Sequence, residues 1–236
     1  MIRLPLPAAI LLAASISSSV SAAGELPGDL SANVALTTNY VFRGITQSDD
    51  GPAIQGGFDY TQGIFYAGTW GSSVDFGDAT NMELDLYAGL SPTYNNVTFD
   101  LGVLYYAYPD SPELATGEQN FVEFYGGANA PLGPVEVGGS VAYSPEFYGE
   151  IGGAFYYQAT AALDLSEETG VDGLVFDASY AFSRFEDDIL GDDYDDYSIG
   201  VSITAFELDL SLRYTGTDGL AGGDNDAISF TISKSF

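Results

Sequence analysis

The amino-acid sequence predicts an all-β fold, namely a transmembrane antiparallel up-and-down β-barrel of about 12 strands that follows a cleaved signal peptide. Three observations support this prediction. The first residues have the composition of an export signal, the remainder alternates between apolar and polar residues, and the chain ends on an alternating segment closed by Phe236.

The N-terminal residues have the order of a secretory signal peptide. Arg3 supplies a positive charge, Leu4 to Ile16 is apolar, and small residues around Ala23 offer a cleavage site. The apolar stretch is too short to span a bilayer. We therefore expect residues 1–23 to be the signal peptide and residues 24–236 to form the barrel as a single domain.

The mature chain alternates with the period of a β-strand. From Met82 to Leu90 every second residue is apolar, and Glu83 and Asp85 lie among the residues between them. About 12 segments show this pattern, which is typical of transmembrane strands. They are residues 30–43, 53–61, 64–75, 82–91, 96–107, 120–130, 135–144, 154–165, 173–184, 197–204, 206–215 and 227–236.

The connections between these segments alternate between short and long. This pattern matches periplasmic turns and extracellular loops, and an even number of strands places both termini in the periplasm. After residue 23 no apolar run approaches the roughly 18 residues that a spanning helix needs, so strands are the expected way of crossing a membrane. A soluble β-sandwich also alternates, but the regularity of the segments and the aromatic residues near their ends favour a barrel in the bacterial outer membrane.

The last segment carries a candidate assembly signal. Phe230, Ile232 and Phe236 share the apolar face, which resembles the C-terminal signal that the bacterial barrel-assembly machinery reads. Lys234 departs from this signal, since that face usually carries a hydrophobic residue there. A lysine at a membrane interface can extend its amine to the headgroups. We therefore expect the assembly machinery to be a partner.

Composition excludes several functional classes. The chain has a net charge of −29 and contains neither histidine nor cysteine. A nucleic-acid partner is not expected, because binding it requires basic side chains that replace counterions. Ser–His–Asp and Cys–His catalysis both need residues that are absent. We therefore expect no enzyme and no resident cofactor.

The polar face of the segments is expected to line a lumen rich in carboxylates. Such a lumen attracts cations, which predicts a porin-like channel for passive diffusion of small solutes with a preference for cations. The alternative is a closed structural or surface-receptor barrel without conductance, because inward side chains, among them Tyr87, Tyr106 and Tyr125, can fill a small barrel. The candidate pore-lining residues are Arg43, Asp59, Glu83, Asp85, Asp100, Glu123, Glu136, Asp164, Asp177, Glu207, Asp209 and Arg213.

The densest acidic run includes Asp192, Asp193, Asp195 and Asp196, in or beside an expected extracellular loop. Clustered oxygen ligands suit Ca²⁺ or Mg²⁺, so one hypothesis is a loosely bound divalent cation. The spacing does not match an EF-hand, and a solvated acidic loop is the alternative. Outer-membrane lipids and lipopolysaccharide are further expected partners of the outer surface, and small solutes or cations are those of the lumen.

The N-terminal part of the mature chain resembles a known family. The residues that carry the resemblance are Asn39 to Ile45, Gln55 to Tyr60, Phe65 to Ser72 and Glu83 to Gly89. They are similar to the TorF-type porin family of proteobacteria, whose members are conserved outer-membrane proteins of unknown function. The resemblance implies an outer-membrane barrel with porin activity, and it implies no catalytic residues or substrate.

Overall fold

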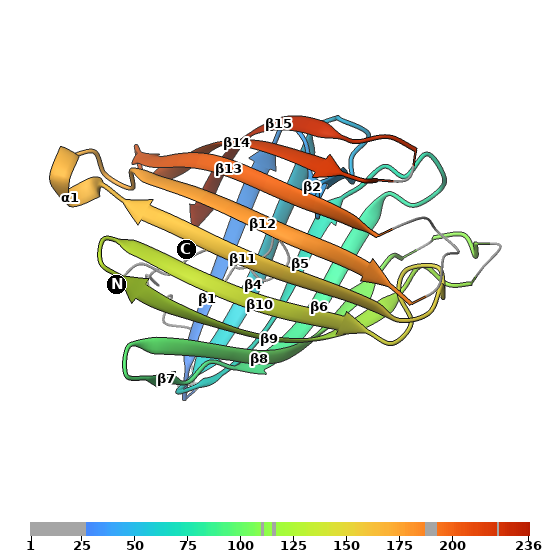
Figure 1. Ribbon diagram of the computed structural model, residues 1–236, viewed down its shortest axis with the longest axis horizontal. Coiled ribbons are helices and arrows are strands. Elements are labelled where there is room, and N and C mark those ends of the chain that lie inside the picture. Colours follow the sequence, from blue (N-terminus) through green and yellow to red (C-terminus); the bar gives the residue numbers. More distant parts are fainter. Residues whose placement is uncertain (1–26, 110, 115–116, 187–192, 221) are drawn as a thin grey trace.

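Strands that follow one another in the chain pair antiparallel, and the first strand also pairs with the last (Figure 1). The computed structural model describes residues 27–109, 111–114, 117–186, 193–220 and 222–236. In this part of the chain, thirteen strands form one sheet, which closes through the pairing of β6 (Met82–Leu90) with β8 (Val97–Ala107). One of the thirteen is the short β7 (Thr93–Tyr94) beside β8, so twelve strands surround the barrel axis. The predicted up-and-down barrel is confirmed.

The other barrel strands are β1 (Asp29–Thr37), β4 (Ala53–Gln62), β5 (Phe65–Ser73), β9 (Phe121–Leu132), β10 (Val135–Ser144), β11 (Ala154–Asp164), β12 (Val175–Phe185), β13 (Tyr194–Ala205), β14 (Leu208–Asp218) and β15 (Asp226–Ser235). Three further elements lie in the connections, and they are β2 (Val41–Phe42), β3 (Ile45–Thr46) and helix α1 (Ser166–Thr169). Each of the predicted segments coincides with one barrel strand, with boundaries that differ by a few residues.

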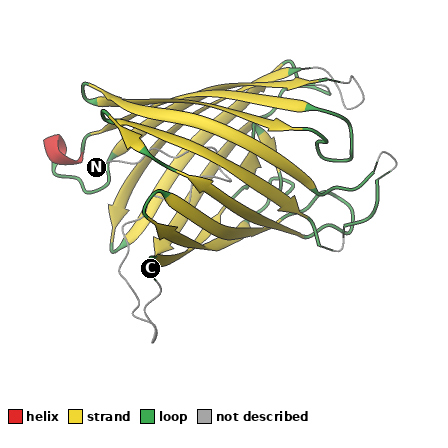
Figure 2. Ribbon diagram, turned by 90° about the horizontal axis from the view of Figure 1, so that it is seen from below, coloured by secondary structure: helices red, strands yellow, loops and turns green. Residues whose placement is uncertain are grey.

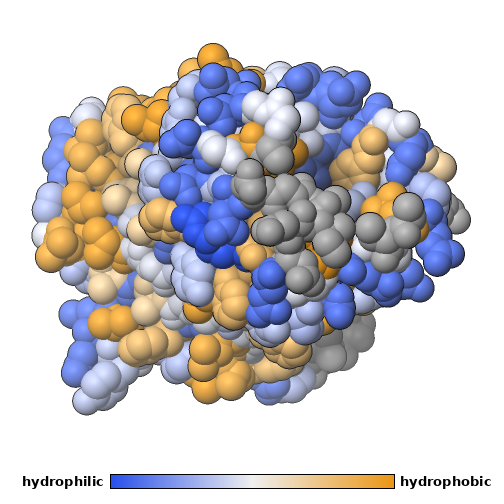
Figure 3. Space-filling model, turned by 45° about the vertical axis from the view of Figure 1, so that its right-hand side comes forward, coloured by the Kyte–Doolittle hydropathy of each residue, from blue (hydrophilic) through white to orange (hydrophobic). Residues whose placement is uncertain are grey.

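Strand alternation sorts the side chains into two faces. In the β14–β15 pair, Leu212 lies opposite Phe230 on the outer face, and Arg213 lies opposite Ser229 on the inner face. Every barrel strand exposes at least one large apolar side chain on the outside. Figure 3 shows these hydrophobic side chains (orange) gathered on the barrel wall at the left of the view. An apolar exterior around a polar interior is the arrangement of a transmembrane barrel.

The two ends of the barrel differ in their connections (Figure 2). At one end the connections are mostly short, and β13 and β14 are joined by Phe206 and Glu207, whose φ angles of 56° and 61° are those of a tight two-residue hairpin turn. Helix α1 also lies at this end, which we call the turn end. The opposite end carries the longer connections, such as residues 38–52 and 145–153, and we call it the loop end.

The first predicted segment, residues 30–43, is wrong at its C-terminal end. Strand β1 stops at Thr37, whose hydroxyl donates to the carbonyl of Asn39 at 2.9 Å and turns the chain. The alternating residues beyond this point belong to β2 and β3, which pair only with each other. Alternation alone does not distinguish a barrel strand from a hairpin that starts beside it.

The candidate assembly residues lie at the barrel seam. Phe230, Ile232 and Phe236 are exposed on the outer face, and the backbone of Phe236 exchanges hydrogen bonds of 2.8 and 3.1 Å with Ala32. Lys234 also points outward, where its amine donates to Glu207 at 2.9 Å. Recognition by the assembly machinery stays a prediction.

No helix within the described ranges is long and apolar enough to cross a membrane. Residues 1–26 lie outside the described residues, so the signal peptide stays a prediction.

Candidate functional site

A small hairpin formed by β2 and β3 folds into the barrel at the loop end. Its two-residue turn consists of Arg43 and Gly44, with φ angles of 46° and 82°, which is the geometry of a tight β-hairpin. Contacts with strands on several sides of the barrel show that residues 41–46 lie across the lumen. We call residues 41–46 the hairpin plug.

One side of the plug region packs on β5, β6 and β8. The hydroxyl of Tyr40, just before the plug, donates to Glu83 at 2.7 Å, and its ring meets the ring of Trp70 edge to face at 5.5 Å. Phe42 makes a similar edge contact with Tyr106 at 5.8 Å. Burial raises the pKa of Tyr40 well above its ordinary value, and so does the neighbouring Glu83. Tyr40 therefore stays neutral and can donate this hydrogen bond.

Arg43 at the plug tip reaches strands β9, β11 and β13. Its Nη2 atom lies 2.8 Å from Oε2 of Glu123, and its guanidinium lies 4.1 Å from the ring centre of Tyr156. The backbone carbonyl of Arg43 accepts a hydrogen bond from the hydroxyl of Tyr194 at 3.0 Å. Burial lowers the pKa of Arg43, but Glu123 and the surrounding tyrosines together raise it above its ordinary value. The guanidinium is therefore charged and forms a buried ion pair.

Gly44 brings the plug into contact with β14. A Cβ atom at this position would lie 2.3 Å from Cγ2 of Thr217 and 3.0 Å from Cβ of Asp196. With a φ of +82°, the backbone there also disfavours any residue with a side chain. Glycine is thus required for the plug to reach this side of the barrel.

We expect the substitution Gly44→Ala to displace the plug. The new methyl group clashes with Thr217, and the left-handed backbone adds about 1 kcal/mol of strain. Arg43, which is buried in the parent, then becomes accessible, and limited digestion with trypsin should cleave after it. The matched control is Gly133→Ala, which shares a positive φ of 64° but has nothing within 4 Å of its Cβ position. Equal protection of Arg43 in the two variants would contradict this assignment.

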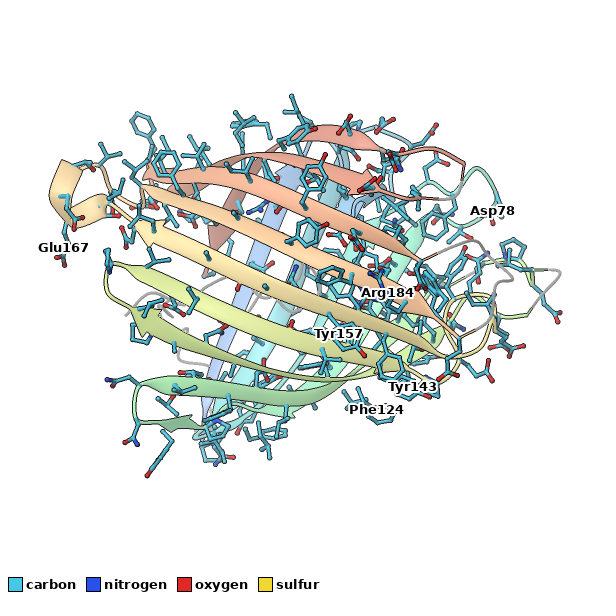
Figure 4. The ribbon with its side chains drawn as sticks, viewed as in Figure 1. Asp78, Phe124, Tyr143, Tyr157, Glu167 and Arg184 are labelled. Carbon is cyan, nitrogen blue, oxygen red and sulfur yellow. The ribbon has the colours of Figure 1, made fainter. Side chains whose placement is uncertain are left out.

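Aromatic side chains from three loop-end connections pack above the plug. The rings of Phe76, Tyr108 and Tyr148 lie 5.4 to 6.0 Å apart in each pair. Burial raises the pKa of Tyr148 to about 12. Beside them, Gln119 donates to Asp78 at 3.2 Å and joins two of the loops, and Figure 4 shows Asp78 at this end of the molecule. This aromatic cap adds a second layer to the closure of the loop end.

Burial of the inward side chains changes along the barrel axis. Near the loop end they are almost fully buried, and this layer includes Thr37, Ala53, Trp70, Glu83, Asp85, Tyr106, Glu123, Ser144, Tyr156, Ser183, Asp196 and Thr217. Toward the turn end, small inward side chains stay partly exposed, and they include Ser31, Asn33, Ser179, Ser202, Ser211, Ser229 and Ser233. On the wall formed by β1 and β12 to β15, the inner face is therefore polar and partly accessible to solvent on the turn-end side of the plug. We call this part of the lumen the vestibule.

The buried layer contains a group of carboxylates. Glu123 accepts hydrogen bonds from Arg43 at 2.8 Å and from the Tyr106 hydroxyl at 3.1 Å, both at the same oxygen. Asp85 lies opposite Tyr106 in the β6–β8 register and is completely buried, yet neither of its oxygens accepts a hydrogen bond. Nε of Arg43 is also buried without a partner. A buried carboxyl group and a buried guanidinium nitrogen thus both lack a hydrogen-bond partner in this layer.

The carboxylates in the middle of the barrel are paired with other lumenal side chains. The hydroxyl of Tyr87 donates to Asp59, and the hydroxyl of Tyr66 donates to Asp100. On the opposite wall, Arg213 binds Asp177 at 2.7 Å and Ser198 at 2.8 Å. The wall around β4 to β9 is thus filled with tyrosines, and the wall around β12 to β15 carries small polar residues.

The structure places most of the predicted pore-lining residues on the inner face of the wall. Asp59, Glu83, Asp85, Asp100, Glu123, Glu136, Asp164, Asp177, Asp209 and Arg213 occupy inward register positions. Two of the predicted residues do not lie on a strand of the wall. Arg43 belongs to the plug instead of a strand, and Glu207 lies in the β13–β14 turn with its side chain exposed to pair with Lys234. The alternation predicts Glu207 on the inner face of a strand, but the chain turns at Phe206 and Glu207, so neither residue belongs to a strand.

Sequence reasoning missed the plug as a unit, and with it the roles of Tyr40 and Tyr156. A usable signal was present, because Gly44 directly follows the predicted segment that ends at Arg43, and glycine suits the second position of a tight turn. Nothing local in the sequence indicates that the turn enters the barrel.

The acidic run near β13 does not converge on one point. Asp193 and Asp195 both bind Arg184, at 3.6 and 3.0 Å, whereas Asp196 points inward and accepts a hydrogen bond from Tyr156. Neighbouring strand residues point to opposite faces, so Asp195 and Asp196 cannot share an ion. Asp192 lies outside the described residues, and within the described ranges no group of three or more acidic residues is arranged to hold a metal.

Comparisons with known proteins relate this barrel to solved structures of Pseudomonas aeruginosa proteins. OpdQ has a TM-score of 0.47 and 12% identity over 85% of this chain and 59% of its own. OccK5 (OpdH) has a TM-score of 0.49 and 15% identity over 86% and 62%. The outer membrane protein OpdK has a TM-score of 0.49 and 11% identity over 90% and 68%. The chain thus spans between 59% and 68% of the length of these three.

No curated protein matches the chain in sequence. A family model described as a bacterial protein of unknown function (Gcw_chp) matches residues 21–235.

Proposed function

The chain belongs to the Gcw_chp family of bacterial proteins of unknown function, and we propose that it is an outer-membrane channel for passive diffusion of small solutes, closed at the loop end by the hairpin plug. The observation that carries this proposal is the vestibule. A barrel with an apolar exterior and a solvent-accessible polar interior suits a membrane pore. The resemblance to TorF-type porins supports the same function.

The charges of the inner face favour cations. The inward carboxylates include Asp59, Glu83, Asp85, Asp100, Glu123, Asp177 and Asp196. Arg43 and Arg213 each neutralise one of them, at 2.8 and 2.7 Å. An acidic excess in a confined passage attracts cations and repels anions. We therefore propose that the open channel prefers cations.

Recordings in planar bilayers test this proposal. In a KCl gradient, the purified barrel should conduct whenever the plug is displaced from the lumen, with a reversal potential of the sign that K⁺ selectivity requires. The double variant Asp59→Asn, Asp100→Asn should shift the reversal potential toward zero, because it removes two lumenal charges. The matched control is the double variant Glu167→Gln, Glu168→Gln, which removes two charges from α1, outside the barrel (Figure 4). An anion-selective reversal potential in the parent would contradict the cation preference.

A specific observation also favours the alternative, a closed structural or surface-receptor barrel. The plug and the aromatic cap above it close the loop end of this structure. A closed barrel shows no conductance even when the plug is removed, whereas a plugged channel then conducts.

The proposed location in the outer membrane also leads us to proposals for the termini, the partners and the role of the protein. We propose that both termini face the periplasm and that the turn end lies on that side. The proposed partners are outer-membrane lipids and lipopolysaccharide, the barrel-assembly machinery, and small solutes or cations. We propose a transport role without catalysis, since the chain has no histidine or cysteine.

A further inference from the structure

We infer that the barrel wall under the plug is a binding site for guanidinium groups, occupied in this structure by Arg43 and available to guanidinium-bearing solutes when the plug withdraws. The use of the site by solutes rests on the proposed channel function. The binding itself does not, because every wall residue of the site belongs to the barrel strands.

The groups that hold Arg43 suit a planar cation. Glu123 of β9 pairs with Nη2 at 2.8 Å, and the ring of Tyr156 of β11 lies 4.1 Å from the guanidinium carbon. A carboxylate at the edge and an aromatic ring beside the cation are a recurrent way of binding guanidinium. When the plug leaves, both groups remain on the wall.

The wall offers more carboxyl groups than the plug pairs with. Glu83, Asp85 and Glu123 are all buried in this layer, and Arg43 pairs with Glu123 alone. Asp85 has no hydrogen-bond partner at either oxygen, and Nε of Arg43 has none either. A tethered arginine therefore satisfies the site only in part. A free guanidinium is not constrained by the hairpin backbone and can turn toward more of these acceptors.

The same residues do not suit a metal ion. In the described part of the chain, no three acidic side chains are arranged to coordinate one. The rings that border the carboxylates are Trp70 and Tyr106, which flank Asp85 on the two neighbouring strands. Aromatic faces stabilise organic cations, so this environment favours a guanidinium over an inorganic ion.

A fluorescence titration tests the site independently of conductance. Trp70 is the only tryptophan of the chain, and its ring lies 5.5 Å from Tyr40 at the base of the plug. In Arg43→Ala, methylguanidinium should produce a saturable change in Trp70 fluorescence, and the parent should not respond at the same concentrations. The double variant Arg43→Ala, Glu123→Gln should bind about tenfold more weakly, because it loses a charged hydrogen bond. Methylammonium should also bind Arg43→Ala more weakly than methylguanidinium does.

Two further variants serve as controls. Arg213→Ala removes the other lumenal arginine, which pairs with Asp177 outside this layer, and it should behave as the parent does. Arg43→Lys keeps a positive charge but lacks the planar group, so methylguanidinium should displace the lysine and change the fluorescence. Heat-modifiable migration on gels reports whether each variant folds, and Arg43→Lys serves in place of Arg43→Ala if the latter does not fold.

Bilayer recordings then separate the site from the channel. Arg43→Ala should stay open longer than the parent, and millimolar methylguanidinium should reduce its current. If fluorescence shows binding but no variant conducts, the channel proposal fails and the site stands. The inference is overturned if folded Arg43→Ala gives no saturable response, or if Glu123→Gln leaves the affinity for methylguanidinium unchanged.

Discussion

Excision of the hairpin plug should convert the barrel into a channel with several-fold larger conductance than the parent. The plug crosses the lumen from Tyr106 on one side to Thr217 on the other, and these contacts leave the vestibule closed at the loop end. The excision is feasible because the nitrogen of Gln47 donates to the carbonyl of Tyr40 at 2.7 Å. An Asn–Gly turn can therefore replace residues 41–46 without moving the flanking chain.

A matched excision at the turn end controls for the loss of residues. The nitrogen of Leu165 donates to the carbonyl of Leu174 at 2.9 Å, so an Asn–Gly turn can also replace residues 166–173, which include α1. This variant should keep the conductance of the parent, because α1 lies outside the barrel wall. Single-channel recordings of the two variants and the parent make the comparison. If removal of the plug leaves the conductance unchanged, the plug does not close the lumen, and the closed-barrel alternative follows if none of the three proteins conducts.

Placing an arginine on the outer face should destabilise the barrel far more than placing one on the inner face. Leu212 lies near the middle of β14 with 49% of its surface exposed on the outside, where the proposed location puts lipid. Leu212→Arg should cost about 2–4 kcal/mol of folding free energy, the penalty for a cation near the bilayer midplane. Urea unfolding in liposomes measures this cost.

The neighbouring residue provides the control for this substitution. Ser211 points into the vestibule, opposite Ser202 and Thr231 on the adjacent strands. These side chains are small and partly exposed, so Ser211→Arg should change the folding free energy by less than about 1 kcal/mol, the range of exposed substitutions. Equal destabilisation by the two arginines would show that the outer face of β14 does not meet lipid.

The barrel itself could be predicted from the sequence because the residue pattern that determines it is local. Alternation of apolar and polar residues reports which face of a strand meets each environment, so Glu83 and Asp85 could be placed on the inner face without any knowledge of their partners. The same rule failed for Glu207, which lies in a two-residue turn with positive φ angles. Neither residue of this turn is Gly, Asn or Asp, the residues that usually mark such a turn in a sequence.

The plug could not be predicted from the sequence because the residues that hold it are distant in the chain. Arg43 pairs with Glu123, which is 80 residues away, and its carbonyl accepts a hydrogen bond from Tyr194, which is 151 residues away. Arg43 also fits the alternation of the segment before it, so a strand position satisfied every local criterion. A tight turn at Arg43 and Gly44 could be suspected from the sequence, but its position inside the lumen follows only from the closed sheet.

These distant partners also impose an order on maturation. The residues that receive the plug and the adjoining Tyr40 come from β5, β6, β8, β9, β11, β13 and β14, so all these contacts can form only after nearly the whole circumference has formed. Contacts with such large sequence separation are slow to form, because loop-closure entropy is lost before the contact is gained. We therefore expect the wall of the barrel to form before residues 41–46 dock, so that docking of the plug is the step that closes the loop end.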